Sequence, residues 1–394
     1  MTSAIFNPRT LKIIQISVKL CSSLGSSPYD WDFKRNSITV HSTHRRKIAF
    51  TVGTVTSFLY SCFLFWRLVQ NFSDPNPSVP VILWLLLWMF ITGWGLIGYV
   101  NAYMKKEEVA ALFKGVKLLA GNLEREYKAF KIAKLVWKFN KIDVFYLVLI
   151  YIAILYTVAV TLMFIVAPTK PQYLYSLIPG FGKNWENNYF LFTLFIGIEV
   201  YVKASTAWII MATDTYTILP TLIPTAVWVE YFYGKTRSIP TSLLISNYQN
   251  FHILISYYNN AIIPLVAPIL PIFCPFVICT LCAFGAIRCH GFLPIFEYVP
   301  FLVLANNGVV VLTLVLFPLT ADFENSNKLC EKIRQQRKSD KKVDRKRIAG
   351  LQPFGVRLGV VQKVKKMAIL LSYNFIANCI FTLLITFPQE KVTR

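Results

Sequence analysis

Two charged residues in an otherwise apolar stretch are the first candidates for chemistry in this sequence. Glu199 and Lys203 stand four residues apart in LFIGIEVYVKASTAW. On a helix this spacing puts both side chains on one face, where a carboxylate and an ammonium form an ion pair. Charges in an apolar helix are costly unless they are paired or face a cavity. The spacing therefore predicts a self-neutralising pair, or a carboxylate at Glu199 that borders a binding cavity.

Residues typical of catalysis or metal binding are few and poorly placed. Cys279 and Cys282 form a C-x-x-C motif, but no second cysteine pair or nearby histidine completes a zinc site. No nucleophile stands beside a base. We therefore predict no enzyme, no metal and no cofactor, and interpret the cysteines as small packing residues. The histidines, all in connections or at the boundaries of apolar stretches, are His41, His44, His252 and His290.

Long apolar stretches decide the fold class. Of the 394 residues, 55% are hydrophobic and 15% are charged, and the mean hydropathy is +0.50. Soluble domains carry about 25% charged residues, and a helix needs about 20 apolar residues to cross a bilayer. Because a backbone in lipid must satisfy its own hydrogen bonds, we predict an all-α integral membrane protein with seven spanning helices in one bundle. The predicted spans are about 48–68, 79–101, 143–167, 189–213, 262–287, 292–318 and 367–388.

Two of these spans have irregular features. The sequence does not define the carboxyl-terminal end of the fourth span, because weakly polar sequence continues to about Tyr231. The fifth contains four prolines between positions 264 and 275. A proline inside a spanning helix frees a carbonyl and kinks the axis, so we expect the fifth helix to be bent or broken.

Lysine and arginine residues collect on one set of connections between the predicted spans. Counted alternately from the amino-terminal segment, one set of connections holds 34 of them and the other holds 5. Positive residues favour the cytoplasm, so we predict a cytoplasmic amino terminus and an extracellular carboxyl terminus. The net charge of +22 then reflects topology, not nucleic-acid binding, which needs a basic folded domain. A glycosylation sequon at Asn71 falls on the predicted outer side.

The last predicted span carries a polar residue at every fourth position. Successive members of such a series advance about 40° around a helix and therefore share one face. Polar side chains in a span face a partner helix or water. Two interpretations stay open: hydrogen bonding to another helix of the same chain, or a water-filled pore or subunit seam. The series in SYNFIANCIFTLLITF is Asn374, Asn378, Thr382 and Thr386.

This inverted seven-span plan resembles the arthropod gustatory and odorant receptor superfamily. The second cytoplasmic connection is long and basic, NYQNFHILISYYNN precedes the fifth span, and the last span ends in CIFTLLITF. At that end the family has T-Y, five hydrophobic residues and Q-F. Here the spacing, the hydrophobic residues and Phe387 match, whereas Cys379, Ile380 and Thr386 replace Thr, Tyr and Gln. The chain is identified as a divergent, gustatory-receptor-like member.

The resemblance implies a tetrameric, ligand-gated and non-selective cation channel in the plasma membrane, surrounded by membrane lipid. It implies a small tastant or odorant as the ligand, a role in the perception of taste, and no need of a G protein. The last span of each subunit would form the pore, with a hydrophobic gate at Leu383 and Phe387 beside Asn378, Thr382 and Thr386. Subunits would meet at a cytoplasmic anchor region, about 215–261 and 319–366, which is basic and helix-compatible.

A ligand pocket is implied in the outer halves of spans two, three, four and six. An aromatic wall with few polar groups suits small organic ligands. Asn306 and Asn307 lie mid-span, and at least one of them must face inward. The pocket residues expected are Trp84, Trp88, Tyr156, Phe192, Phe195, Glu199, Phe296, Phe301 and Asn306.

A multi-pass secondary transporter of a small solute is the alternative function. Glu199 and Lys203 would suit ion coupling, but transporters are often built from repeated halves, and seven spans without internal similarity do not fit that plan. The identity of the ligand stays open. So does the choice between a homomer and a heteromer with a co-receptor.

Overall fold

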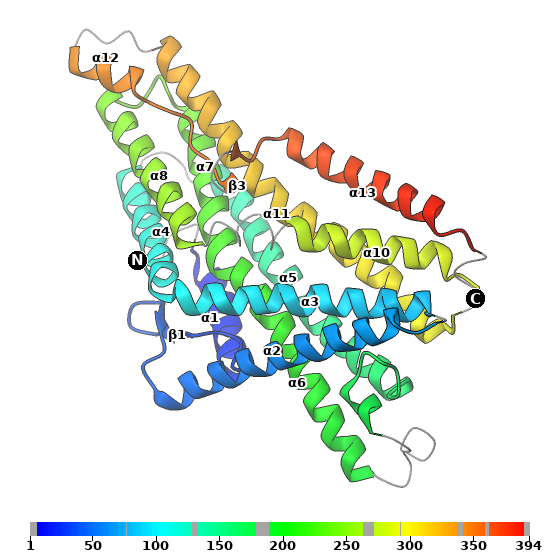
Figure 1. The fold of residues 1–394 in the computed structure, drawn as a ribbon. Coiled ribbons are helices and arrows are strands. Elements are labelled where there is room, and N and C mark those ends of the chain that lie inside the picture. The colour runs from blue at the N-terminus through cyan, green and yellow to red at the C-terminus, as the bar shows by residue number, and fades with distance from the viewer. Residues whose placement is uncertain are drawn as a thin grey trace.

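The chain forms an elongated bundle of helices (Figure 1). The computed structural model describes residues 6–75, 77–127, 133–178, 189–262, 272–291, 293–336, 342–358 and 362–389. Six of the described helices have the length and hydropathy of a membrane span, which confirms the predicted helical, multi-pass membrane architecture. In chain order the helices are α1 (Pro8–Ser23), α2 (His44–Phe72), α3 (Val79–Met104), α4 (Lys106–Glu126), α5 (Ala133–Val166), α6 (Tyr189–Thr213), α7 (Leu219–Gly234), α8 (Thr241–Ala261), α10 (Cys274–Arg288), α11 (Ile295–Gln336), α12 (Lys342–Ala349) and α13 (Met367–Thr386).

A short β-hairpin precedes the first span, although only helices were predicted. It pairs β1 (Tyr29–Asp32) with β2 (Ser37–Val40) in antiparallel register. His41, just after β2, bonds to β1 and to the residues before it. Its ring nitrogens lie 3.0 Å from an Asp30 carboxylate oxygen and 2.8 Å from the Ser27 carbonyl oxygen. Residues 27–41, which precede the first span, are therefore folded.

An amphipathic helix, α1, packs the amino-terminal segment against the bundle. Asn7 caps it by accepting a hydrogen bond of 2.8 Å from the Thr10 amide. Ile14 and Val18 are fully buried on its inner face. The Thr10 hydroxyl donates to the Asp143 carboxylate over 2.5 Å, which joins this helix to the start of the apolar part of α5.

The fourth span continues well beyond its predicted end. α6 covers 189–213, and a π-helical turn (Asp214–Ile218) then joins it to α7. One apolar helix therefore runs from Tyr189 to Gly234. This continuity explains why the sequence shows no polar break after position 213. The first three predicted spans correspond to α2, α3 and the apolar part of α5.

The predicted fifth span is shorter than expected in the described part of the chain. Ile262 is extended, with φ −110° and ψ 130°, and ends α8, so the predicted start at 262 is wrong. α10 has 15 residues, which span about 22 Å of helix against a hydrocarbon core of about 30 Å. Pro275 lies in its first turn, where a missing amide hydrogen costs nothing. The prolines between 264 and 271 fall outside the described residues.

The predicted anchor region folds together at one end of the molecule. In Figure 1, α7, α8, α12 and the far end of α11 gather at the upper left. The Asn325 amide of α11 donates to the Ala226 carbonyl of α7 over 3.2 Å. The Lys332 ammonium likewise donates to the Tyr233 carbonyl over 2.6 Å. These bonds join the two longest helical units of the chain side by side.

Residues 350–358, which we call the strap, leave the helical pattern expected for 319–366. α12 ends at Ala349, and residues 351–356 of the strap have no regular secondary structure. The strap ends in β3 (Arg357–Leu358), which pairs with β4 (Gln362–Lys363) ahead of α13. Gly350 has poor helix propensity, and Pro353 lacks an amide hydrogen and disfavours helix in the residue before it. The region 319–366, interpreted as helix-compatible, is therefore not helical throughout.

The strap is held between α8 and α11 by both packing and hydrogen bonds. Phe354 is buried, with its ring centroid 5.1 Å from that of Tyr248 and 6.1 Å from that of His252. The Ser326 hydroxyl donates to the Phe354 carbonyl over 2.6 Å and accepts from its amide over 3.1 Å. The Asn259 side-chain amide donates to the Gly355 carbonyl over 3.2 Å. The segment leading to α13 is thus bonded to the anchor region.

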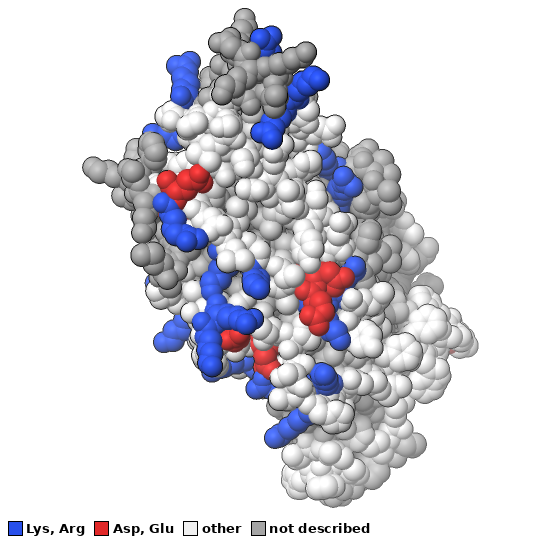
Figure 2. Space-filling model, turned by 90° about the vertical axis from the view of Figure 1, so that its left-hand side faces the viewer, with Lys and Arg blue, Asp and Glu red and all other residues white. Residues whose placement is uncertain are grey.

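Basic side chains cover the side where α4, the first hairpin and the start of α2 lie. Figure 2 shows this side, on which lysine and arginine are spread widely and acidic residues are fewer. Arg45, Arg46 and Lys47 are exposed at the start of α2. Lysine and arginine are the residues that favour cytoplasmic connections, but the orientation of the chain stays a prediction.

Candidate functional site

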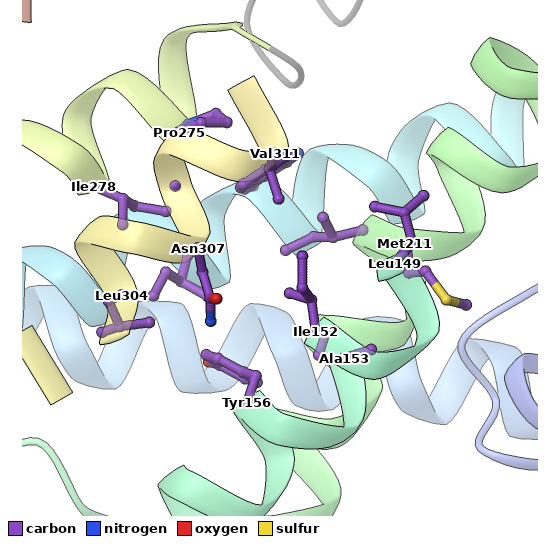
Figure 3. A pocket seen from close by; sticks show the side chains of 15 residues that line it. Leu149, Ile152, Ala153, Tyr156, Met211, Pro275, Ile278, Leu304, Asn307 and Val311 are labelled. Atoms are coloured by element: carbon purple, nitrogen blue, oxygen red, sulfur yellow. The ribbon is translucent and has the colours of Figure 1, made fainter. Parts of the chain in front are cut away.

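Five helices line an apolar cavity that is partly open, shown in Figure 3. Its volume is about 100 Å³. An apolar cavity of ~150 Å³ in another protein binds benzene, so the ligand portion held inside this smaller, partly open cavity is no larger than about one aromatic ring. The cavity is lined from α3, α5, α6, α10 and α11 by Ile91, Trp94, Leu149, Ile152, Ala153, Tyr156, Ala207, Ile210, Met211, Pro275, Ile278, Leu304, Asn307, Gly308 and Val311.

Two glycines let the helices around this cavity approach closely. At Gly308 of α11, an added Cβ would lie 2.6 Å from the Cys279 sulfur of α10. At Gly95 of α3, it would lie 2.7 Å from the Thr206 methyl carbon of α6. Small residues allow helices to pack at short separation in membranes. One contact brings α11 close to α10, and the other brings α3 close to α6. All four of these helices line the cavity.

Glu199 and Lys203 are both buried on α6, but neither relies on the other for its contacts. The Glu199 carboxylate accepts hydrogen bonds of 2.8 Å from the Tyr60 hydroxyl and 2.7 Å from the Leu174 amide. The Lys203 nitrogen forms no hydrogen bond with the described residues and lies 3.8 Å from the centroid of the Trp88 ring. The expected ion pair is thus replaced by a hydrogen-bonded carboxylate and a cation–π contact.

The connection between α5 and α6 is fastened to several spans. Leu174 donates its amide to Glu199 of α6. Arg67 of α2 donates to the Ser176 carbonyl over 3.1 Å. The Lys170 ammonium lies 2.9 Å from the Glu297 carboxylate of α11. The described part of the connection, residues 167–178, is therefore a cover fixed to α6 and to the ends of α2 and α11.

An aromatic cluster lies beside the cavity and joins four of the predicted pocket residues. Trp84 stacks on Trp88 with centroids 6.3 Å apart, and meets Phe301 at 4.3 Å. Trp88 meets Tyr156 edge to face at 6.0 Å. Of the predicted pocket residues, Tyr156 alone lines the cavity as the described residues outline it. The other three support its wall from the side nearer the connection.

The remaining predicted pocket aromatics lie elsewhere. Phe192 stacks on Phe164 with centroids 5.8 Å apart, and Phe195 packs edge to face on Tyr175 at 5.5 Å. These residues form a separate core beneath the α5–α6 connection. Phe296 is 62% exposed. The structure does not bring these three residues to the cavity.

Asn307, not Asn306, faces the cavity. Asn306 is exposed, whereas Asn307 lines the cavity and its amide points toward Tyr156 (Figure 3). Consecutive residues differ by 100° around a helix, so one of the pair had to face inward, but the prediction for Asn306 chose the wrong one. Trp94 and Met211 were missed as well, because the expected pocket lay one or two turns nearer the outer ends of the spans.

The last helix, α13, is almost bare in a single subunit. Its apolar window is 6% buried, against 28–56% for the other candidate spans, and Ile376 is its one buried side chain. The polar series is exposed along its length. The Thr382 and Thr386 hydroxyls each donate over 2.8 Å to a carbonyl of their own helix. The four-residue polar series thus faces away from the subunit's own helices.

The residues assigned to the gate lie closer to the subunit than the polar series. Leu383 is half-buried against the core. The Phe387 ring meets the Phe284 ring of α10 edge to face, with centroids 6.1 Å apart. Their distance from a pore axis depends on neighbouring subunits, so the gate stays a prediction.

Two further sequence expectations concern modification and metals. The Asn71 sequon lies in the last turn of α2, where the asparagine is half-buried. Its glycosylation stays a prediction. In the described ranges, no three His, Cys, Asp or Glu side chains gather as a metal site.

The arrangement of spans, cover, anchor region and bare last helix has known counterparts. Neither a protein-family model nor a curated protein matches the sequence. The olfactory receptor OR5 of the insect Machilis hrabei, solved in complex with eugenol, matches with a TM-score of 0.66 and 12% identity over 95% of this chain and 98% of that one. A second structure of that receptor matches with a TM-score of 0.64 and 11% identity over 95% and 97%. The chain has the insect olfactory-receptor fold.

The match to the olfactory-receptor fold spans nearly the whole chain, so it includes the membrane helices and the anchor region alike. The predicted resemblance to the gustatory and odorant receptor superfamily is thereby confirmed at the level of the fold. Both of these structures are of an olfactory receptor. This agrees with the expectation that the chain does not catalyse a reaction.

Proposed function

We propose that the chain is one subunit of a chemosensory, ligand-gated and non-selective cation channel of the gustatory-receptor type. Four copies of α13 line its pore. The bare surface of this helix carries the proposal. An amide such as that of Asn378 has no partner in hydrocarbon, whereas beside a water-filled axis it is hydrated.

The ligand of this channel binds in the cavity between α3, α5, α6, α10 and α11. Aromatic and aliphatic walls with few polar groups suit a small organic molecule. A receptor with the same fold has been solved with eugenol, which is also a small organic molecule. Tyr156 packs on Trp88, and the Lys203 ammonium lies over the Trp88 ring, one turn from Glu199. Glu199 accepts from the Leu174 amide of the cover, so a ligand is sensed across several spans.

The channel lies in the plasma membrane with its amino terminus in the cytoplasm. The basic side in Figure 2 then faces the cytosol, and the α5–α6 cover faces outward. Epitope tags at the two ends of the chain on intact cells test this orientation. Antibody that reaches the first residue, or that fails to reach the last, contradicts it.

Current recordings test the proposal as a whole. Cells that express this chain, alone and with a co-receptor, should show a cation current evoked by at least one member of a small-molecule panel. Asn378→Leu should change the conductance or ion preference of single channels, because it removes a polar group from the pore. Solute uptake without conductance would instead support a secondary transporter.

A further inference from the structure

Two polar side chains face one another in a cavity that is otherwise apolar. The Tyr156 hydroxyl is buried and has no hydrogen-bond partner among the described residues. The Asn307 amide enters from α11 and points toward Tyr156 (Figure 3). A buried hydroxyl without a partner is destabilising, so a group that satisfies it on binding gains affinity.

The rest of the lining restricts the charge and polarity of what binds. Apart from the Trp94 indole, the other lining side chains are aliphatic or small. No charged side chain lines the cavity as described, so an ion would lose its hydration without a counter-charge. A polyol would bring more hydroxyls than the Tyr156 and Asn307 pair can satisfy. The volume of about 100 Å³ limits the ligand to about one ring.

We propose that Tyr156 and Asn307 select neutral, single-ring ligands that carry one hydroxyl oxygen over hydrocarbons of the same size. The ligand hydroxyl donates to the Asn307 carbonyl and accepts from the Tyr156 hydroxyl. An amide and a hydroxyl each offer both a donor and an acceptor, so a single hydroxyl satisfies one group on each wall. The inference rests on the proposed function, because it names the ligand class of the same cavity.

Binding of two matched probes to the purified full-length protein tests this selection. Phenol and toluene have nearly the same shape and differ in a hydroxyl against a methyl group. Affinity is read from the rise in melting temperature with probe concentration. Phenol should bind about tenfold more tightly than toluene, as one satisfied hydrogen bond predicts.

Substitutions that remove one polar group each should erase the difference. Tyr156→Phe deletes only the hydroxyl oxygen, and Asn307→Leu replaces the amide with an isosteric apolar group. Each should weaken phenol binding about tenfold and leave toluene binding unchanged. Tyr151→Phe and Asn306→Leu are matched controls, because Tyr151 is 63% exposed on the same helix as Tyr156 and Asn306 is exposed beside Asn307. Both controls should keep the wild-type ratio.

Three results would overturn the inference. They are equal binding of phenol and toluene, a ratio that survives in both Tyr156→Phe and Asn307→Leu, and absence of binding by either probe. Partition of the probes into detergent affects every variant alike, so the comparison is made between variants. Failure of the channel proposal looks different, because phenol would then bind selectively without evoking a current.

Discussion

His252 and Phe354 lie face to face, with their ring centroids 6.1 Å apart and their planes inclined by 18°. The contact joins α8 to the strap that leads to α13. Burial lowers the pKa of His252, and the positive charges of Lys363 and Arg357 lower it further. The neutral imidazole is therefore the form that fits between these groups.

Acid should weaken the contact between α8 and the strap. Because the pKa of His252 in the folded protein lies below its ordinary value of 6.5, its contribution to stability is complete above about pH 6.5 and is lost as the pH falls through the lowered pKa. The melting temperature should fall by about 2 °C more for the wild type than for His252→Gln between about pH 7.5 and pH 5.5. An equal fall in both proteins would show that other groups cause it.

The contacts of Glu199 predict a strong dependence of stability on its carboxylate. Glu199→Leu leaves the Leu174 amide without an acceptor and leaves the Lys203 ammonium without a carboxylate one turn away. The Tyr60 hydroxyl loses one of its two acceptors and keeps the Gln172 carbonyl. We expect a loss of about 3 kcal/mol in the free energy of unfolding, measured by denaturation of the purified protein.

Two further variants separate the effect of the Glu199 charge on stability from the effect of its hydrogen bonds. Glu199→Gln keeps one acceptor oxygen and should cost less than Glu199→Leu. The double variant Glu199→Leu with Lys203→Leu removes the uncompensated charge and should be more stable than Glu199→Leu alone. A double variant that is less stable than the single one would show that Lys203 is stabilised by the Trp88 ring without help from the carboxylate.

The close approach of α11 to α10 makes Gly308 sensitive to any side chain. Gly308→Ala places a methyl group 2.6 Å from the Cys279 sulfur and should cost about 2 kcal/mol through overpacking. Gly197→Ala on α6 meets nothing within 4 Å and should stabilise its helix by about 0.5 kcal/mol or more. Thermal melting compares the two.

A second substitution should rescue the Gly308 variant. Cys279→Ala removes the sulfur and makes room for the new methyl group. The double variant should therefore melt above Gly308→Ala. A double variant that melts as low as the single one would mean that the backbone of α10 causes the clash.

Truncation of the proposed gate residues of α13 should cause a leak current. Leu383→Ala or Phe387→Ala should raise the current in the absence of ligand several-fold, because a narrower apolar side chain admits water to the constriction. Whole-cell recording at matched surface expression measures the leak. Phe58→Ala, which is 53% exposed on α2, is a control for general damage and should leave the leak unchanged. An unchanged leak in both gate variants would remove the gate from these positions.

The lengths of the hydrophobic runs predicted most of the fold, because the thickness of the bilayer sets how long a spanning helix must be. They failed where other forces decide. α1 and the β1–β2 hairpin are short amphipathic elements whose stability comes from packing on the spans. No long hydrophobic run in the sequence therefore indicates them. The strap was interpreted as helix-compatible, although Gly350 and Pro353 argue against a helix.

The candidate site was harder to predict than the fold. The sequence indicated four of the five helices that line the cavity and left out α10. Trp84, Trp88, Tyr156 and Phe301 do lie together, but their role in binding a ligand stays a prediction. Periodicity does not set the rotation of a span that is apolar on all sides, which is why Asn306 was preferred to Asn307. It also does not set depth, so Trp94 was overlooked.

The bareness of α13 has a consequence for biosynthesis. A newly made copy that reaches the endoplasmic reticulum alone exposes asparagine and threonine to lipid along a whole helix. In the proposed assembly its lifetime then depends on how soon it meets another copy, and the yield of intact protein should rise steeply with the rate of synthesis. Cells would regulate the number of working receptors by the local abundance of the chain as much as by its intrinsic folding.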